Sequence, residues 1–189
     1  TEVEDDGDLY CDCFGNIEDC AGACNGDAVE DCTGECNGSA VEDCAGECGL
    51  TAVELWGYCY DIATTAEIDL AWQDISGEIP SEIGQLTNLT SLHLNGNIFL
   101  SGSIPIEIGN LVNLEFLILS DTGLTGEIPE EIGQLTNLKS IVFNNTAFTG
   151  EIPIEIGYLE NLLTLELRSV GLTGEIPEEI CNLSLSWLE

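Results

Sequence analysis

The stretch Gly126–Gly150, GEIPEEIGQLTNLKSIVFNNTAFTG, recurs along the chain with a period of 24 residues. All five prolines of the chain fall in the same tetrapeptide, Gly-x-Ile-Pro, and they are spaced 25, 24, 24 and 24 residues apart. These prolines are Pro80, Pro105, Pro129, Pro153 and Pro177. A fixed period of this length indicates an array of stacked structural units.

Within each unit the apolar residues follow the pattern L-x-x-L-x-x-L-x-L, as at Leu86, Leu89, Leu92 and Leu94. The alternation at the end of the pattern predicts one short strand per repeat, with one face turned inward. Full burial of an inward leucine or isoleucine contributes about 1.5–3 kcal/mol. That burial is available only when a neighbouring repeat covers the side chain. The sequence therefore predicts a solenoid whose repeats do not fold alone.

This pattern resembles the 24-residue leucine-rich repeat, L-x-x-L-x-L-x-x-N-x-L-x-G-x-I-P-x-x-I-G-x-L, of plant receptors and secreted microbial proteins. The resemblance covers five repeats, from about Ala66 to Leu183. It implies an α/β-type solenoid with parallel strands on a concave face. An extra residue within 97–102 should bulge that turn.

One column departs from the family pattern. The family's asparagine, which bonds to the backbone of the turn, is retained only at Asn97, so the other turns must find other partners. Here the column reads Gln73, Asn97, Thr122, Thr146 and Val170.

Residues 1–60 have a different composition, with nine of the ten cysteines, sixteen acidic residues and no lysine or arginine. A second repeat of twelve residues begins at Cys20, Cys32 and Cys44. Each of these units offers too little apolar surface to fold without covalent or ionic support. We therefore expect three parts: an acidic cysteine-rich segment (1–54), an aromatic N-terminal cap (55–65) and a leucine-rich repeat domain with an incomplete C-terminal cap (66–189).

The regular cysteine spacing predicts a ladder of disulfide bridges and an extracellular protein. Zinc is the alternative, but His93 is the only histidine and lies in the distant repeats, so bridges are favoured. The pairing cannot be read from the sequence, and the odd number in residues 1–60 leaves one cysteine without an N-terminal partner. The cysteines expected in bridges are Cys11, Cys13, Cys20, Cys24, Cys32, Cys36, Cys44, Cys48, Cys59 and Cys181.

Acidic and amide side chains between these cysteines could bind calcium, a hard cation that takes six to eight oxygen ligands. The pattern also resembles the acidic cysteine repeats of secreted microbial proteins and, more remotely, thrombospondin type 3 repeats. The alternative is that the carboxylates only solvate an exposed ladder, and the sequence leaves both open. The calcium hypothesis names Asn25, Asp27, Asp31, Asn37 and Asp43.

The formal net charge of −34 argues against nucleic acid and anionic lipid as partners, because Lys139 and Arg168 are the only basic residues. Cations, cationic surfaces and neutral glycans are not disfavoured. The sequence contains no run of eighteen apolar residues, so it predicts no membrane span. The missing initiator methionine suggests a removed signal peptide. The residue sets for nucleophilic or phosphoryl chemistry are missing, so we expect no enzymatic activity.

Two surfaces are candidate contact sites. Phe116, Ile118 and Val142 should form an apolar patch at the centre of the concave face. At the C-terminal end, Trp187 and Leu188 should centre a contact with another molecule. The apolar residues expected to face water there are Ile180, Leu183, Leu185, Trp187 and Leu188. Acceptor sequons for N-linked glycans occur at Asn37, Asn88, Asn144 and Asn182.

Two functions follow from these surfaces. The first is an extracellular structural protein that forms a head-to-tail fibre or surface coat, since an unlike-surface contact propagates unless it closes into a ring. In that assembly Cys181 would bridge to Cys11 or Cys13 of the next molecule. The alternative is a secreted recognition module that binds a protein or glycan on the concave face.

Overall fold

The computed structural model describes residues 42–47, 49 and 51–188 of the chain. The chain divides into two compact units, Thr1–Thr51 and Ala52–Glu189. The 12-residue repeats that begin at Cys20 and Cys32 lie outside the described residues. The disulfide ladder therefore stays a prediction.

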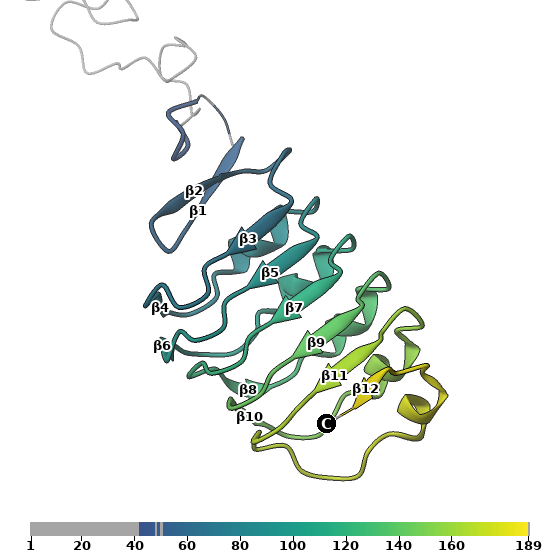
Figure 1. Cartoon of the computed structure of the whole chain (residues 1–189). Coiled ribbons are helices and arrows are strands. Elements are labelled where there is room, and N and C mark those ends of the chain that lie inside the picture. The colour runs from purple at the N-terminus through teal and green to yellow at the C-terminus, as the bar shows by residue number, and fades with distance from the viewer. Residues whose placement is uncertain (1–41, 48, 50, 189) are drawn as a thin grey trace, which may run out of the picture. The chain divides into compact units, whose positions relative to one another are not determined.

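The second unit is built on a six-stranded parallel sheet in residues 52–188, to which each repeat contributes one strand (Figure 1). The strands are paired in chain order, and each is in register with the next. They are β3 (Glu67–Asp69), β5 (Ser91–His93), β7 (Phe116–Ile118), β9 (Ser140–Val142), β11 (Thr164–Glu166) and β12 (Trp187–Leu188). The predicted parallel arrangement is confirmed.

Burial alternates along these strands as the sequence predicts. In β3, β5, β7, β9 and β11 the central residue is buried, and the residues on either side of it are half-buried or exposed. The register places Leu92 beside Leu117, and Leu117 beside Ile141. One face of the sheet thus covers the core, and the other, which we call the sheet face, points outward.

The opposite side of each repeat is a short 3-10 helix, and the described residues contain no α-helix. In the first such helix Ile83 N–H donates to the Pro80 carbonyl and Leu86 N–H to the Ile83 carbonyl, at 3.0 and 3.1 Å. Residues three apart share one side of a 3-10 helix, so the I-x-x-L-x-x-L spacing places Ile83, Leu86 and Leu89 on the core side, where all three are fully buried. These helices are η1 (Ser81–Gln85), η2 (Ile106–Asn110), η3 (Glu130–Gln134), η4 (Ile154–Tyr158) and η5 (Glu178–Asn182).

A third side joins the sheet to the helices through short strands that pair in parallel. The first glycine of each Gly-x-Ile-Pro lies in this segment and has a positive φ, which is +77° at Gly126. Glycine adopts this conformation more readily than other residues. The pairs are β4 (Ser76–Gly77) with β6 (Phe99–Leu100), and β8 (Thr125–Glu127) with β10 (Ala147–Thr149).

A β-hairpin covers the first repeat. Strands β1 (Ala52–Leu55) and β2 (Tyr58–Asp61) are antiparallel, and Trp56 and Gly57 at their turn both have positive φ. Val53 and Leu55 join the core, while Trp56 and Tyr60 pack against it. Tyr58 stays largely exposed. The fully packed residues of the cap are therefore the aliphatic side chains of β1, and its aromatic side chains are only partly buried or exposed.

Asn97 is fully buried and bonds to the turn of its own repeat and to the turn of the preceding repeat. Its Oδ1 accepts from the N–H groups of Gln73 and Ile75, and its Nδ2 donates to the carbonyls of Leu70 and Leu94. At the matching positions the turns use another partner. The hydroxyls of Thr122 and Thr146 donate to the carbonyls three residues earlier, at 2.8 Å.

A second row of asparagines links each repeat to the one before it, a feature that our sequence analysis did not predict. The Nδ2 group of each donates to a backbone carbonyl of the preceding repeat at 2.8–2.9 Å. The row consists of Asn88, Asn113, Asn137 and Asn161.

The C-terminal end differs from our expectation. Ile180 is buried rather than exposed, and Leu183 and Leu185 are half-buried against the core. The reason is that η5 stacks on η4 and the chain then returns as strand β12 beside β11. Trp187 and Leu188 are exposed.

Replacing Asn97 tests the role of this side chain in the turns. Asn97→Ala leaves two N–H groups and two carbonyls without their partner, so we expect a loss of at least about 3 kcal/mol in the free energy of unfolding. Thr122→Ala removes one hydrogen bond and should cost about 1 kcal/mol. Urea denaturation measures both, and equal losses would contradict the assigned role of Asn97.

Candidate functional site

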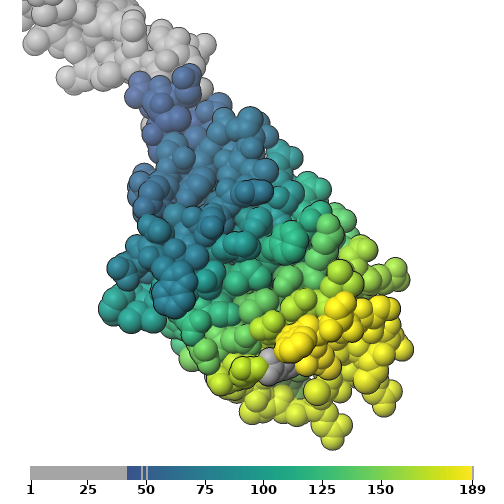
Figure 2. All heavy atoms as spheres, in the orientation of Figure 1, coloured from purple at the N-terminus to yellow at the C-terminus, as the bar shows by residue number. Residues whose placement is uncertain are grey.

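The sheet face carries the predicted apolar patch. The register of β7 and β9 places Ile118 beside Val142 and Phe116 beside Ser140. Phe116 is 39% exposed, and Ile118 and Val142 are half-buried. The structure thus brings the three predicted residues together on adjacent strands. Figure 2 shows the molecule from this side, with the repeats following one another along a continuous surface.

Polar side chains next to the patch are held by hydrogen bonds. Asn144 Nδ2 donates to Glu166 Oε2 at 2.6 Å, and Asn144 Oδ1 accepts from Arg168 N–H at 2.8 Å. On the other flank, Ser91 Oγ lies 3.2 Å from His93 Nε2. An apolar centre with an ordered polar border is the usual anatomy of a protein-binding surface.

A second surface was not recognised from the sequence. A groove of about 1370 Å³ runs along the Gly-x-Ile-Pro segments of the second to fifth repeats and the first turns of η2 to η5. We call it the acidic groove, because glutamates line it and lysine and arginine do not. Its glutamates are Glu127, Glu130, Glu131, Glu151, Glu155, Glu175, Glu178 and Glu179.

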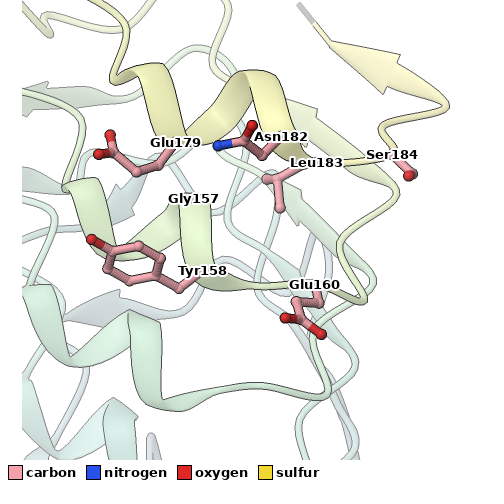
Figure 3. Close-up of a pocket in the computed structure, with 7 residues that line it drawn as sticks. All are labelled: Gly157, Tyr158, Glu160, Glu179, Asn182, Leu183 and Ser184. Carbon is pink, nitrogen blue, oxygen red and sulfur yellow. The ribbon is translucent and has the colours of Figure 1, made fainter.

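Two hollows lie near the C-terminal end. One, of about 440 Å³, opens between η4 and η5, where Tyr158 and Glu179 project on the same side of Gly157 (Figure 3). The other, of about 290 Å³, is mostly apolar and includes Leu165, Ile176 and Leu188. The predicted contact residues Trp187 and Leu188 therefore lie two strands away from β9, at the end of the sheet, and not with the apolar patch.

Asp43 is the one predicted calcium ligand among the described residues, and its carboxylate already has four hydrogen-bond donors. Oδ2 accepts from the Thr51 hydroxyl and N–H at 2.6 and 3.0 Å, and Oδ1 from the N–H groups of Ala45 and Glu47 at 2.9 and 3.2 Å. The Thr51 hydroxyl is the main cause of a pKa lowered from 3.8 to about 2; desolvation opposes it, and the backbone N–H groups add to it.

The predicted metal ligands Asn25, Asp27, Asp31 and Asn37 lie outside the described residues, so calcium stays a hypothesis. In the part of the chain that the structure describes, no three His, Cys, Asp or Glu side chains are grouped as a metal site. Nor does a helix in that part have the length and apolar character to cross a membrane.

The cysteines fall into three groups. Cys44 and Cys59 are each disulfide-bonded. Cys181 is an exposed free thiol within the chain, so the predicted bridge to another molecule is untested. The remaining predicted bridge cysteines lie outside the described residues: Cys11, Cys13, Cys20, Cys24, Cys32, Cys36 and Cys48.

The sequons differ in their surroundings. Asn88 is exposed, but its Nδ2 donates to the Ala63 carbonyl at 2.8 Å. Asn144 belongs to the polar border of the patch. Asn182 is exposed on η5, and Asn37 lies outside the described residues. Glycosylation at all four stays a prediction.

Comparison with known proteins identifies the repeat. A family model described as Leucine Rich Repeat matches residues 88–111, 113–135 and 161–183. The chain is similar to a structure of the BIR3–SERK2 complex from Arabidopsis thaliana, with 31% identity over 77% of this chain and 74% of that chain, and a TM-score of 0.58. A search of curated protein sequences finds no match.

Two longer receptors are also similar. A TDR receptor shares 42% identity over 65% of this chain, with a TM-score of 0.63. The Arabidopsis HAESA ectodomain, solved with an N-terminally extended IDA peptide hormone, shares 41% identity over 60% of this chain, with a TM-score of 0.56. This chain covers only 21% and 19% of those two chains, so it spans about a fifth of their length.

The Asp43 turn makes a pH-dependent prediction. Because its pKa is lowered in the folded chain, the carboxylate stabilises the turn above pH 3.8, and that contribution is lost as the pH falls towards 2. An NMR titration of the Thr51 amide proton should show a midpoint near 2. Asp43→Asn should abolish the titration, and a midpoint near 3.8 would contradict these hydrogen bonds.

Proposed function

The chain belongs to the leucine-rich repeat family, and from this premise we propose that it is a non-catalytic, extracellular recognition module that binds a protein or peptide on its sheet face. The observation that carries the proposal is the apolar patch of Phe116, Ile118 and Val142 with its hydrogen-bonded polar border. Related ectodomains support it, since one was solved with a peptide hormone and another in a BIR3–SERK2 complex.

The patch suits a binding role because folding does not require apolar side chains at these outward positions. The buried neighbours of these side chains on the same strands, Leu117 and Ile141, already supply the core contact. Phe116 could therefore be polar without loss of packing, yet it is aromatic, a residue type that often anchors interfaces. Its rigid strand also lowers the entropic cost of binding.

Extracellular location is part of the proposal. The disulfide-bonded Cys44 and Cys59 support it, because such bonds persist in oxidising compartments. We also propose that residues 1–54 form the disulfide-supported segment that the 12-residue repeats predict. Calcium in that segment is a further hypothesis, on which the recognition function does not depend.

The patch is tested with peptides selected from a random displayed library against the native protein. Phe116→Asp and Val142→Asp should stay folded but lose at least about tenfold in affinity, because the new carboxylates disrupt the apolar centre. Thr87→Asp adds the same charge at an exposed turn away from the patch and should bind normally.

Circular dichroism supplies the folding control. Leu117→Asp buries a carboxylate in the core and should unfold the solenoid. If no peptide is enriched, or if the selected peptides bind the Phe116→Asp and Thr87→Asp variants equally well, the recognition proposal is wrong.

Head-to-tail assembly into a fibre or coat is a second candidate, favoured by the apolar hollow at the end of the sheet. Trp187 is 56% exposed there, and Leu188 continues the column of inward strand residues in β12, the edge strand of the sheet among the described residues. A further repeat, from the same polypeptide or from another molecule, would stack on this end.

Sedimentation velocity at high protein concentration tests the assembly. If copies stack at this end, the wild-type protein should form oligomers, and Trp187→Glu should shift it to monomers by placing a charge in the contact. Ser186→Glu, a neighbouring exposed position, controls for added charge. A wild-type protein that sediments only as a monomer under oxidising conditions would rule out the fibre.

A further inference from the structure

The acidic groove is more than a solvated charged face, because its carboxylates alternate with exposed apolar side chains. Ile106, Ile154 and Ile176 line it and are 60%, 41% and 61% exposed. Pro129, Pro153 and Pro177 contribute to the same lining. A surface that only needed solubility would place polar residues at these positions.

The glutamates of the groove are held by close packing on glycines of neighbouring repeats. A Cβ added at Gly150 would lie 2.9 Å from Cγ of Glu127, and one at Gly133 would lie 2.5 Å from Cβ of Glu155. The same relation recurs between Glu151 and Gly174. The aliphatic stems therefore lie against the backbone in two rows, which reduces the freedom that a bound partner would have to remove.

The charge of the groove is not compensated by groups that line it. Eight glutamates and no lysine or arginine are present in the lining. Neighbouring members of one row belong to repeats stacked about 5 Å apart, which is the spacing of adjacent strands, so the carboxylates repel one another. The basic residues of the chain lie elsewhere: Lys139 pairs with Glu115 at 2.6 Å, and Arg168 follows β11.

We propose that the acidic groove binds an extended basic segment of a partner protein, in which lysine or arginine residues alternate with apolar ones. The charged side chains pair with the row of Glu127, Glu151 and Glu175. The apolar side chains, which point to the opposite side of an extended segment, cover Ile106 and Ile154. The four repeats of the groove span about 15 Å, which an extended segment of about five residues would fill. This surface is separate from the patch on the sheet face, so the inference goes beyond the proposed function.

The probe is a fluorescent seven-residue peptide of alternating lysine and isoleucine, and its affinity for the whole chain is measured by fluorescence anisotropy near 0.15 M salt. Replacing its isoleucines by serine should weaken binding at least about tenfold, because only the charge pairing remains. If the lysine–serine peptide binds equally well, the groove has no apolar specificity and the proposal is overturned.

Matched variants locate the site. The triple variant Glu127→Gln, Glu151→Gln, Glu175→Gln should lose at least about tenfold in affinity for the lysine–isoleucine peptide. A control triple variant, Glu54→Gln, Glu67→Gln, Glu160→Gln, changes the net charge equally outside the groove and should lose less than about twofold. Equal losses would show non-specific attraction to the acidic chain and overturn the proposal.

Two further variants separate this site from the sheet face. Ile106→Ser with Ile154→Ser should weaken binding of the lysine–isoleucine peptide and leave that of the lysine–serine peptide unchanged. Phe116→Asp should leave both unchanged, since Phe116 lies on the sheet face. If Phe116→Asp, but not the isoleucine variant, abolishes binding, the peptide occupies the patch, which overturns the groove proposal and supports the proposed function.

Discussion

The stacking of one inward-facing apolar residue per strand is the interaction on which the rest of the structure depends. Leu92, Leu117 and Ile141 lie side by side in the parallel register, and all three are fully buried. Because side chains alternate along a strand, this register also fixes which residues point outward. The apolar patch and its polar border are therefore consequences of the buried column.

The same stacking constrains the other sides of each repeat, since equivalent segments of successive repeats must lie one strand spacing apart. Each 3-10 helix is only five residues long and stacks on the helix of an adjacent repeat. Glycines allow the backbones of neighbouring repeats to approach closely. At Gly157, for example, an added Cβ would meet the Cβ of Glu179. The glutamate rows of the acidic groove thus occupy positions that the close packing of successive repeats creates.

The sequence predicts the alternation along the strands because alternation depends on local spacing. The parallel sheet and the role of Asn97 were expected from the resemblance to the leucine-rich repeat. The spacing of three residues between apolar positions also indicates 3-10 helices, a conclusion that our sequence analysis did not draw. The acidic groove could not be predicted, since it depends on how Glu127 and Glu151 lie over glycines of the next repeat. The burial of Ile180 was missed because it depends on a strand, β12, that the repeat pattern does not mark.

The two candidate surfaces differ in their electrostatics, and this difference follows from the distribution of the basic residues. With 36 acidic and two basic residues, most carboxylates must take their counterions from solvent or from a partner. Both basic residues lie beside strands of the sheet, and the exposed pair of Lys139 with Glu115 contributes less than about 1 kcal/mol. The acidic groove receives neither. Binding in the groove should therefore weaken steeply with ionic strength, whereas binding to the apolar patch depends mainly on buried area and responds little to salt.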